Sequence, residues 1–420
     1  MHQETKIKVG IGFATGRKSF QRVLKTNIYN WLESGLTNEK NVSLNLLVAY
    51  DLKYSHTKSA DYTNVSSSLL QLIDETYFIG KTAIQAAIDE LTAAGVASEE
   101  QAKLVFGNGY AAKRNILLYT ALKNGMDYLI FLDDDEYPMA VTNTRSSAIW
   151  GGQHVLETHL RNIEHADITN GYHCGYVSPI PYIAFDDVLT ESKFRSFIEA
   201  LSNDIVNWDT IRSVMQSGGV TYADTDVLVN KEVREVEEIN HAKFISGANL
   251  CINLTKPERT SPFYNPPGAR GEDTFLSICL SRRKVLRVPC YTFHDGFSTY
   301  HHLMDGVLPI RLRRIQADSE PIIERFYRAC IGWIRYKPLL LYITQREKYE
   351  EKIAGMRKHL AQTLPSVCVY FQNGAFMDIL KELDRYHGNV EKHYRQFADS
   401  QAIWAGICEY IADGNAKKSD

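Results

Sequence analysis

The sequence predicts an α/β fold in which a mixed, mostly parallel sheet is flanked by helices and followed by a carboxyl-terminal helical appendage. Three observations support this prediction. Between residues 6 and 132, short apolar runs alternate with segments of helical apolar spacing, which is typical of strands joined by helical crossovers. Residues 128–132 are apolar without alternation, as a strand covered on both faces requires. Beyond residue 309 only helical patterns follow.

The amino-terminal half is predicted to begin with a strand at residues 6–13, a tight turn at residues 14–18 and a helix over residues 20–34 that Ser19 caps. A second strand is predicted at residues 42–50, with Asp51 at its carboxyl end. The next part carries a polar loop at 54–65, two helical patterns within 68–95, a short third strand at 103–106 and a helix at 111–123.

The later segments are predicted from weaker patterns. They are a helix at 150–167, a strand and turn at 168–181, a helical insert at 185–216, a lid or edge strand at 227–240, strands at 244–254 and 285–290, and helices at 322–335, 339–360, 376–386 and 390–411. The helix at 150–167 contains His154, His159 and His165, whose spacing of five and six residues is not that of a helical metal pair. We interpret these three histidines as surface or packing residues.

Composition excludes some functional classes. The net charge of −3 and the pI of about 6.5 give no field that favours nucleic acid. The amino terminus is polar and no apolar run approaches a membrane span, so a cytoplasmic protein is expected. The seven cysteines are widely spread and contain no C-x-x-C pair, which indicates small core residues in a reducing compartment.

Four acidic residues, Asp133, Asp134, Asp135 and Glu136, directly follow the apolar run at 128–132. Like charges at this spacing repel one another unless a positive partner neutralises them. In an open α/β sheet the carboxyl edge of the strands is also where ligands bind. A divalent cation with oxygen ligands is the simplest neutralising partner. The alternative is that these acids only cap a helix or face solvent.

Residues 107–138 resemble the nucleotide-sugar core of GT-A fold glycosyltransferases, in which a small-residue turn and a basic-Arg-Asn triplet open a helix before a strand that ends in a D-x-D motif. The resemblance implies a Rossmann-like sheet. It places Asp135 on the metal, and Asp133 on the ribose or a metal-bound water, with Asp134 between them. Lys113 and Arg114 would reach the nucleotide; as an alternative, they form a solvated first helical turn.

The same resemblance implies further donor contacts. Asp51 matches the acid that contacts the base, although a loop cap is an equal alternative. The turn after the first strand would lie under the nucleotide, and its residues are Ala14, Thr15, Gly16 and Arg17.

A second acid pair, Glu272 and Asp273, lies in a turn at residues 268–274. This turn is similar to the Gly-Glu-Asp segment of inverting, family-two-like GT-A enzymes, which implies that Asp273 is the catalytic base. Glu272 is its rival or an acceptor-binding acid, and a helix cap is the structural alternative for Asp273. Small residues in the strand at 244–254 leave room for an acceptor, and they are Gly247, Ala248 and Asn249.

His294 follows the strand at 285–290 and matches the downstream histidine that completes the metal site in several members of the fold. An imidazole ligand beside carboxylates suits Mn²⁺ better than Mg²⁺. His301 and His302 are alternatives, and any of the three is also compatible with a buried, hydrogen-bonded imidazole.

These features together predict a metal-dependent glycosyltransferase, of the hexosyltransferase type, that uses Mn²⁺ or Mg²⁺. It would move a sugar, with inversion, from a UDP- or GDP-linked donor to a sugar or glycoconjugate acceptor. Residues 1–308 form the transferase domain, with a nucleotide-sugar half at 1–138 and an acceptor-binding and catalytic half at 139–308. Residues 309–420 form the helical region, whose face could contact the inner membrane surface or a second copy; ordinary packing is the favoured alternative.

Three alternatives stay open at the level of sequence. A retaining GT-A transferase would use the same metal site. A sugar-1-phosphate nucleotidyltransferase has a related sheet, but its Gly-rich, Arg-containing first loop is poorly matched by residues 14–18. A non-catalytic metal- or carbohydrate-binding protein would have no need of a second acid pair.

Overall fold

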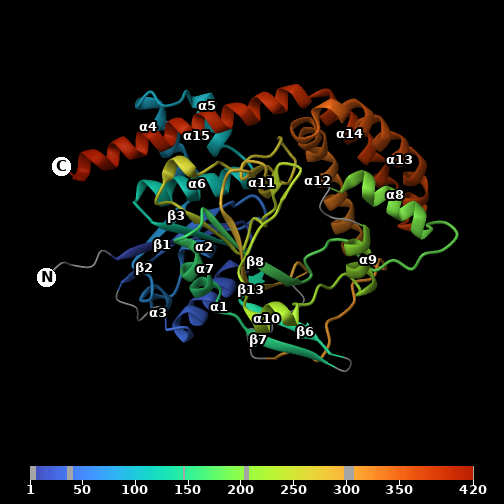
Figure 1. The fold of residues 1–420 in the computed structure, drawn as a ribbon, viewed down its shortest axis with the longest axis horizontal. Coiled ribbons are helices and arrows are strands. Elements are labelled where there is room, and N and C mark those ends of the chain that lie inside the picture. Colours follow the sequence, from blue (N-terminus) through green and yellow to red (C-terminus); the bar gives the residue numbers. More distant parts are fainter. Residues whose placement is uncertain (1–5, 36–40, 145–146, 203–207, 298–306, 420) are drawn as a thin grey trace.

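The computed structural model describes residues 6–35, 41–144, 147–202, 208–297 and 307–419. It has a mixed α/β architecture built on one curled sheet, with helices on both faces and further helices at the carboxyl terminus (Figure 1). Along the sheet the strands follow the order β3 (Glu75–Ile79), β2 (Val42–Tyr50), β1 (Ile7–Thr15), β4 (Tyr128–Leu132), β12 (Leu250–Asn253), β8 (Ile168–Gly175), β13 (Val285–His294) and β5 (Glu136–Tyr137), and β9 (Arg234–Glu235) also pairs with β13.

Most strands of this sheet point in one direction. β3, β2, β1 and β4 are parallel neighbours, and β8 and β13 are parallel to each other. β12 runs antiparallel to both β4 and β8, so it joins two sets of strands that share one direction. In the register, Thr15 lies opposite Tyr50 and Phe13 lies opposite Leu132. The carboxyl ends of β1, β2 and β4 therefore meet at one edge of the sheet.

The central strand β4 is buried along its whole length, as its unbroken apolar sequence predicts. Its side chains alternate between two cores, so that Ile130 packs on one face and Phe131 on the other. The helices of the sheet region are α1 (Phe20–Glu33), α2 (Ala60–Thr63), α3 (Ser67–Leu70), α4 (Lys81–Ala93), α5 (Glu99–Phe106), α6 (Tyr110–Lys123), α7 (Val155–Ile163), α10 (Thr225–Asn230) and α11 (Glu272–Ser277). α1 and α7 belong to the first core, and α4, α5 and α6 to the second.

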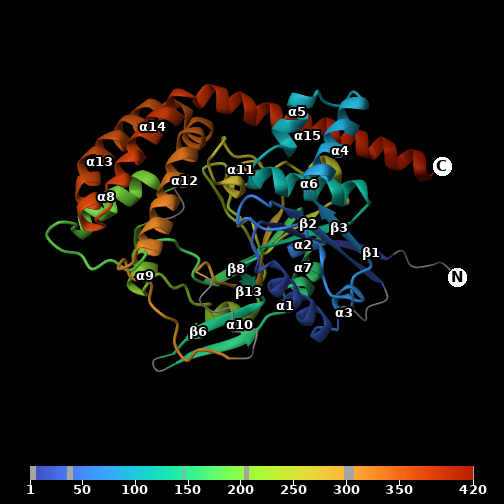
Figure 2. The ribbon, with the colours of Figure 1, turned by 180° about the vertical axis from the view of Figure 1, so that it is seen from behind.

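The helical region predicted beyond residue 309 consists of four long helices, α12 (Glu320–Thr344), α13 (Tyr349–Tyr370), α14 (Asp378–Gly388) and α15 (Val390–Ser419). α12 to α14 share a third core with the insert helices α8 (Glu191–Leu201) and α9 (Trp208–Gln216). α15 then runs back across the sheet region beside α5 and α6, as both views show (Figure 1, Figure 2). There its Trp404 is buried in the second core. The carboxyl-terminal helices therefore pack against the sheet region as well as against α8 and α9.

Several predicted elements are wrong or displaced. Residues 103–106 belong to the helix α5 instead of a strand, because Ser98 and Gln101 form a capping box that starts this helix. The third parallel strand is β3, within the region predicted as helical. The segment at 150–167 begins with strand β7 (Ala148–Gly152), which pairs with β6 (Met139–Asn143), and α7 starts only at Val155. Part of the segment at 227–240 is the edge strand β9; another part, β10 (Glu238–Ile239), pairs with β11 (Ala242–Lys243).

None of the seven cysteines forms a disulfide, and five of them are buried. Within the described ranges, no helix combines the length and the apolar character that crossing a bilayer would require.

Candidate active site

A cavity of about 400 Å³ opens at the edge where the carboxyl ends of β1, β2 and β4 meet. Its lining consists of Ala14, Thr15, Gly16, Arg17, Asp51, Tyr54, Gly109, Tyr110, Lys113, Asp133, Asp134, Asp135, Arg270, Glu272 and His294. The structure thus brings together the predicted nucleotide loop, the acid run, one member of the second acid pair and the predicted metal histidine. The other predicted residues, which are Arg114, Gly247, Ala248, Asn249 and Asp273, are not part of this lining.

The lining also includes Tyr54, Tyr110 and Arg270, which the sequence analysis did not select. Tyr54 covers the turn, since a Cβ atom on Gly16 would lie 2.6 Å from the Tyr54 Cβ. Tyr110 opens α6 and donates a hydrogen bond from its hydroxyl to Asp133 Oδ1 at 2.9 Å. From the sequence, only their positions could have indicated these residues. Tyr110 lies in the first turn of a helix, and Tyr54 and Arg270 lie in loops.

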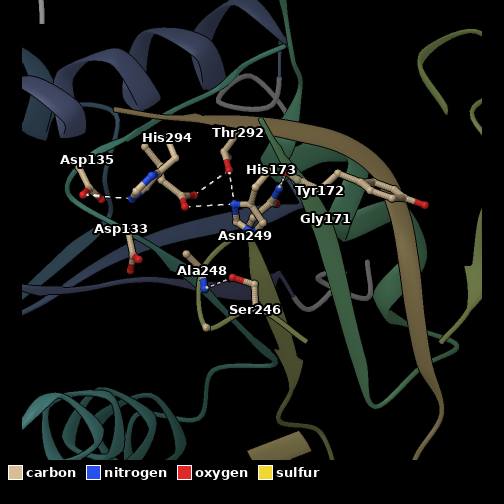
Figure 3. A network of polar contacts seen from close by, with 12 residues as sticks. Asp133, Asp135, Gly171, Tyr172, His173, Ser246, Ala248, Asn249, Thr292 and His294 are labelled. Carbon is tan, nitrogen blue, oxygen red and sulfur yellow. Dashed lines mark hydrogen bonds and ion pairs between the residues drawn. The ribbon is translucent and has the colours of Figure 1, made fainter. Parts of the chain in front are cut away.

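The pairing of β5 with β13 brings His294 to the acid run. His294 lies opposite Glu136 in this antiparallel pair, and the Asp295 backbone N–H donates to the Asp135 carbonyl at 2.9 Å. As a result, His294 Nε2 lies 3.3 Å from Asp135 Oδ2, and the two side chains point toward each other (Figure 3). On its other side, His294 Nδ1 donates to the Tyr176 carbonyl at 2.7 Å. Two segments about 160 residues apart in sequence therefore meet at one point.

The acids Asp134 and Asp135 share a cation from the first loop. Arg17 Nη1 lies 3.2 Å from Asp134 Oδ1 and forms a shorter ion pair with Asp135. The Thr15 hydroxyl donates to Asp134 Oδ2 at 2.5 Å. Burial raises the pKa of Asp134 to about 6, although Arg17 opposes this shift. Burial also acts to raise the pKa of Asp135, but His294 and Arg17 outweigh it and hold this pKa well below its ordinary value.

His294 is the cationic partner of these acids. Burial acts to lower its pKa, but Asp135 and then Glu136 raise it to about 9. Glu136 itself is buried and accepts a hydrogen bond from the Thr292 hydroxyl at 2.7 Å, while His173 Nδ1 lies 3.1 Å from its other oxygen. Figure 3 shows Thr292 and His173 beside each other further along this network. The network fixes the backbone on both sides of the Asp135 and His294 pair.

Arg114 is a buried cation that connects the two groups of acids. Its guanidinium lies 3.1 Å from Asp133 Oδ1 and 3.7 Å from Glu272 Oε1. It also donates to the Gly247 carbonyl, and its guanidinium carbon lies 4.9 Å from the centre of the Tyr110 ring. The side chain is only 2% exposed. Arg114 was predicted to reach the nucleotide; in the structure it is buried between Asp133 and Glu272 and is not among the residues that line the cavity.

The fit of a divalent cation depends on Asp135 and His294. Within the described part of the chain, no group of three histidine, cysteine or acidic side chains converges on one point. Asp133, the third predicted ligand, turns instead toward Arg114 and Tyr110. Once His294 loses the Nε2 proton that faces Asp135, one carboxylate and one imidazole at 3.3 Å nevertheless fit an ion that takes its remaining ligands from phosphate oxygens and water. Such an ion would take the place that Arg17 holds beside Asp135.

Glu272 and Asp273 open α11 and face different surroundings. Gly271 precedes them in the left-handed region, with a φ of 94°, and the Tyr336 ring packs where its Cβ would be. Burial and then Asp273 raise the pKa of Glu272 to about 7, with Arg114 opposing. Asp273 Oδ1 instead accepts from the Thr274 backbone N–H at 2.8 Å. Burial raises the Asp273 pKa as well, and this backbone hydrogen bond opposes the shift.

The predicted acceptor residues lie behind the cavity. The Asn249 side chain is fully buried, with its Oδ1 2.8 Å from His159 Nε2 and its Nδ2 donating to the Tyr172 carbonyl at 3.0 Å. It also fills the space beside Gly171, where a Cβ atom would lie 2.2 Å from it. Asn249 therefore joins β8, β12 and α7. His159, interpreted from sequence as a surface or packing residue, is one of its buried partners.

Lys113 and Asp51 both line the cavity. Burial lowers the pKa of Lys113, and the nearby Asp51 opposes this shift. Asp51 Oδ1 accepts from the Lys53 backbone N–H at 2.9 Å, so this acid also caps its loop. His301 and His302, the alternative metal histidines, lie outside the described residues.

Comparison with models of known protein families finds no match, and a search among curated proteins finds none either. The geometry of this cavity is therefore the main indication of what the protein does.

Proposed function

We propose that this chain is a glycosyltransferase with a GT-A type sheet that transfers a sugar from a nucleotide diphosphate sugar to an acceptor hydroxyl. The observation that carries the proposal is the content of one cavity: the acids Asp133–Asp135, His294, the loop 14–17 and Glu272. The strand order supports it, because β2 and β4 lie on opposite sides of β1. This arrangement makes their carboxyl ends a switch point where ligands bind in α/β sheets.

The donor would lie across this switch point. Its base and ribose fit beside Asp51, Tyr54 and Lys113, and its diphosphate fits near Asp135 and His294. Asp135 is the most acidic group of the run, so it stays ionised and is suited to hold a divalent cation. When bound, Mn²⁺ or Mg²⁺ would supply Lewis-acid stabilisation of the diphosphate.

Glu272 takes the role of general base in this proposal, which reverses the order predicted from sequence. Its carboxylate lines the cavity and its pKa of about 7 is suited to accept a proton at neutral pH. Asp273 is turned toward the backbone of its own helix and raises the pKa of Glu272 by repulsion. The acceptor oxygen bonds to the anomeric carbon while its proton passes to Glu272. The electron pair of the broken bond stays on the diphosphate, and the stereochemistry is inverted.

A nucleotide-release assay with a panel of UDP- and GDP-linked sugars, simple sugar acceptors and Mn²⁺ tests this proposal. We expect release from one donor that depends on the acceptor. Analysis of the product anomer by NMR separates inversion from retention, and release of pyrophosphate from a nucleoside triphosphate would indicate a nucleotidyltransferase instead. Binding of a sugar nucleotide without turnover under all acceptor conditions would contradict the transferase assignment.

A further inference from the structure

Arg325, which α12 contributes from the carboxyl-terminal helices, extends to the candidate metal histidine. Arg325 Nη2 donates to the Tyr176 carbonyl at 3.3 Å, and His294 Nδ1 donates to the same oxygen at 2.7 Å. The guanidinium also lies over the Phe297 ring, with its carbon 3.9 Å from the ring centre. Arg325 is not itself among the residues that line the cavity, but it shares the Tyr176 carbonyl with His294, which is.

The other end of the Arg325 guanidinium is unsatisfied. Its Nη1 is buried and has no hydrogen-bond partner within the part of the chain that the structure describes. A buried guanidinium donor without an acceptor is costly, so this nitrogen is suited to an external oxygen ligand. Burial lowers the pKa of Arg325 to about 10, and the positive charges of Arg17 and Arg270 contribute to the shift while Asp135 opposes it.

Two more guanidinium groups belong to the cavity lining, which does not include Arg325 itself. Arg17 comes from the loop after β1, and Arg270 is an exposed side chain from the loop before α11; both line the cavity. The planar arginine fork matches two phosphate oxygens at once, which a lysine does not. Three forks from three separate segments suit a ligand with several anionic oxygens better than a single carboxylate.

We propose that Arg17, Arg270 and Arg325 bind the diphosphate of the donor, so that α12 completes the donor site. This inference rests on the proposed function and assigns its leaving-group contacts. As the bond between sugar and diphosphate breaks, the electron pair stays on the phosphate oxygen, and the three guanidinium groups stabilise the added charge. The carboxyl-terminal helices then serve catalysis as well as packing.

Calorimetric titration with inorganic pyrophosphate, without added metal, tests the site independently of the nucleotide base and of turnover. We expect the full-length protein to bind pyrophosphate, and Arg325→Gln to weaken binding roughly tenfold or more. Arg325→Lys, which keeps the charge and loses the fork, should weaken it less. Arg328→Gln is the matched control, because Arg328 lies one turn away on α12, is exposed and pairs with Glu324; it should leave binding unchanged.

Arg270→Gln is a second test that does not depend on the folding of the Arg325 variants. The Arg270 side chain is exposed, so its loss should not disturb a core. It should also weaken pyrophosphate binding. No measurable binding by the wild type, or equal binding by the wild type and by both glutamine variants, would overturn the inference. If pyrophosphate binds as expected but no sugar nucleotide is turned over, the anion site stands and the proposed transferase function fails.

Discussion

The two groups of acids around the cavity differ in their counter-charges. Asp135, shortly after β4, has Arg17 and His294 as direct partners, whereas the one ion pair of Glu272 among the described residues is with Arg114, at 3.7 Å. The pKa of Asp135 is consequently held well below its usual value, while that of Glu272 rises to about 7 because burial dominates. Two carboxyl groups thereby differ in acidity, as the proposed roles of a fixed anion and a proton acceptor require.

The largest expected effect comes from removing the proton acceptor. Glu272→Gln should lower kcat by about 10² to 10⁴, the usual contribution of a general base, with little change in the binding of nucleoside diphosphate. Asp273→Asn is the matched variant and should cost less, because Asp273 faces the Thr274 amide. Initial rates and calorimetric binding measure both. A larger loss of kcat in Asp273→Asn than in Glu272→Gln would return the base role to Asp273.

Removing the shared cation should destabilise the fold. Arg114→Met leaves Asp133 and Glu272 without their buried partner, and breaking a buried ion pair costs about 3–5 kcal/mol. Urea denaturation measures the change in the free energy of unfolding. Arg161→Met is the control, because its pair with Glu157 is exposed on one helix and should contribute about 0.5 kcal/mol or less. Equal stability changes in both variants would show that Arg114 does not connect the two groups of acids.

The raised pKa of Glu272 predicts the pH dependence of the reaction. A base with a pKa of about 7 acts only when deprotonated, so kcat/KM should rise as the pH increases to about 7 and then level off. Below this value it should fall roughly tenfold per pH unit. Initial rates at low substrate concentration, measured from about pH 5 to 9, give the profile. A flat profile around neutral pH would exclude Glu272 as the base.

The smallest effect tests how Glu272 is held. Gly271→Ala places a side chain at a φ of 94° and brings its Cβ to 2.9 Å from the Tyr336 ring, so about 1–2 kcal/mol of stability should be lost. Gly355→Ala is the opposite case, since Gly355 lies within α13 with open space around it and should gain about 0.5–1 kcal/mol. Thermal unfolding measures both. A stabilising Gly271→Ala would show that this backbone is not constrained.

Much of the sheet was predictable from local pattern. The buried strand β4, the strand β2 and the helix α6 lie within one residue of their predicted bounds, because apolar runs and helical periodicity set them directly. Strand β3 was predicted as helical and the end of α5 as a strand, since a short apolar run shows neither a clear helical nor a clear strand periodicity. Whether such a segment becomes a strand is decided by pairing with a neighbouring strand, as β3 pairs with β2.

The candidate site, like the sheet, was predictable from the sequence only in part. Asp135 and His294 were predicted as one pair through the family resemblance, and the structure places them 3.3 Å apart. Arg325 gave no signal, because its contact with the Tyr176 carbonyl joins α12 to the end of β8 and depends on the packing of the whole chain. The placement of Asn249 also depends on the whole fold: a small polar residue in a strand is compatible with a ligand contact, whereas the structure buries Asn249 against His159, outside the cavity lining.

Calorimetric titration of UDP and of GDP into the protein, with and without Mn²⁺, tests the central claim most directly. We predict that one of the two nucleotides binds more tightly when Mn²⁺ is present, and that Asp135→Ala removes this dependence because Asp135 is the ionised carboxylate beside His294. Nucleotide binding that is the same with and without Mn²⁺ in both proteins would contradict the account of the acid run at β4 as a metal and diphosphate site.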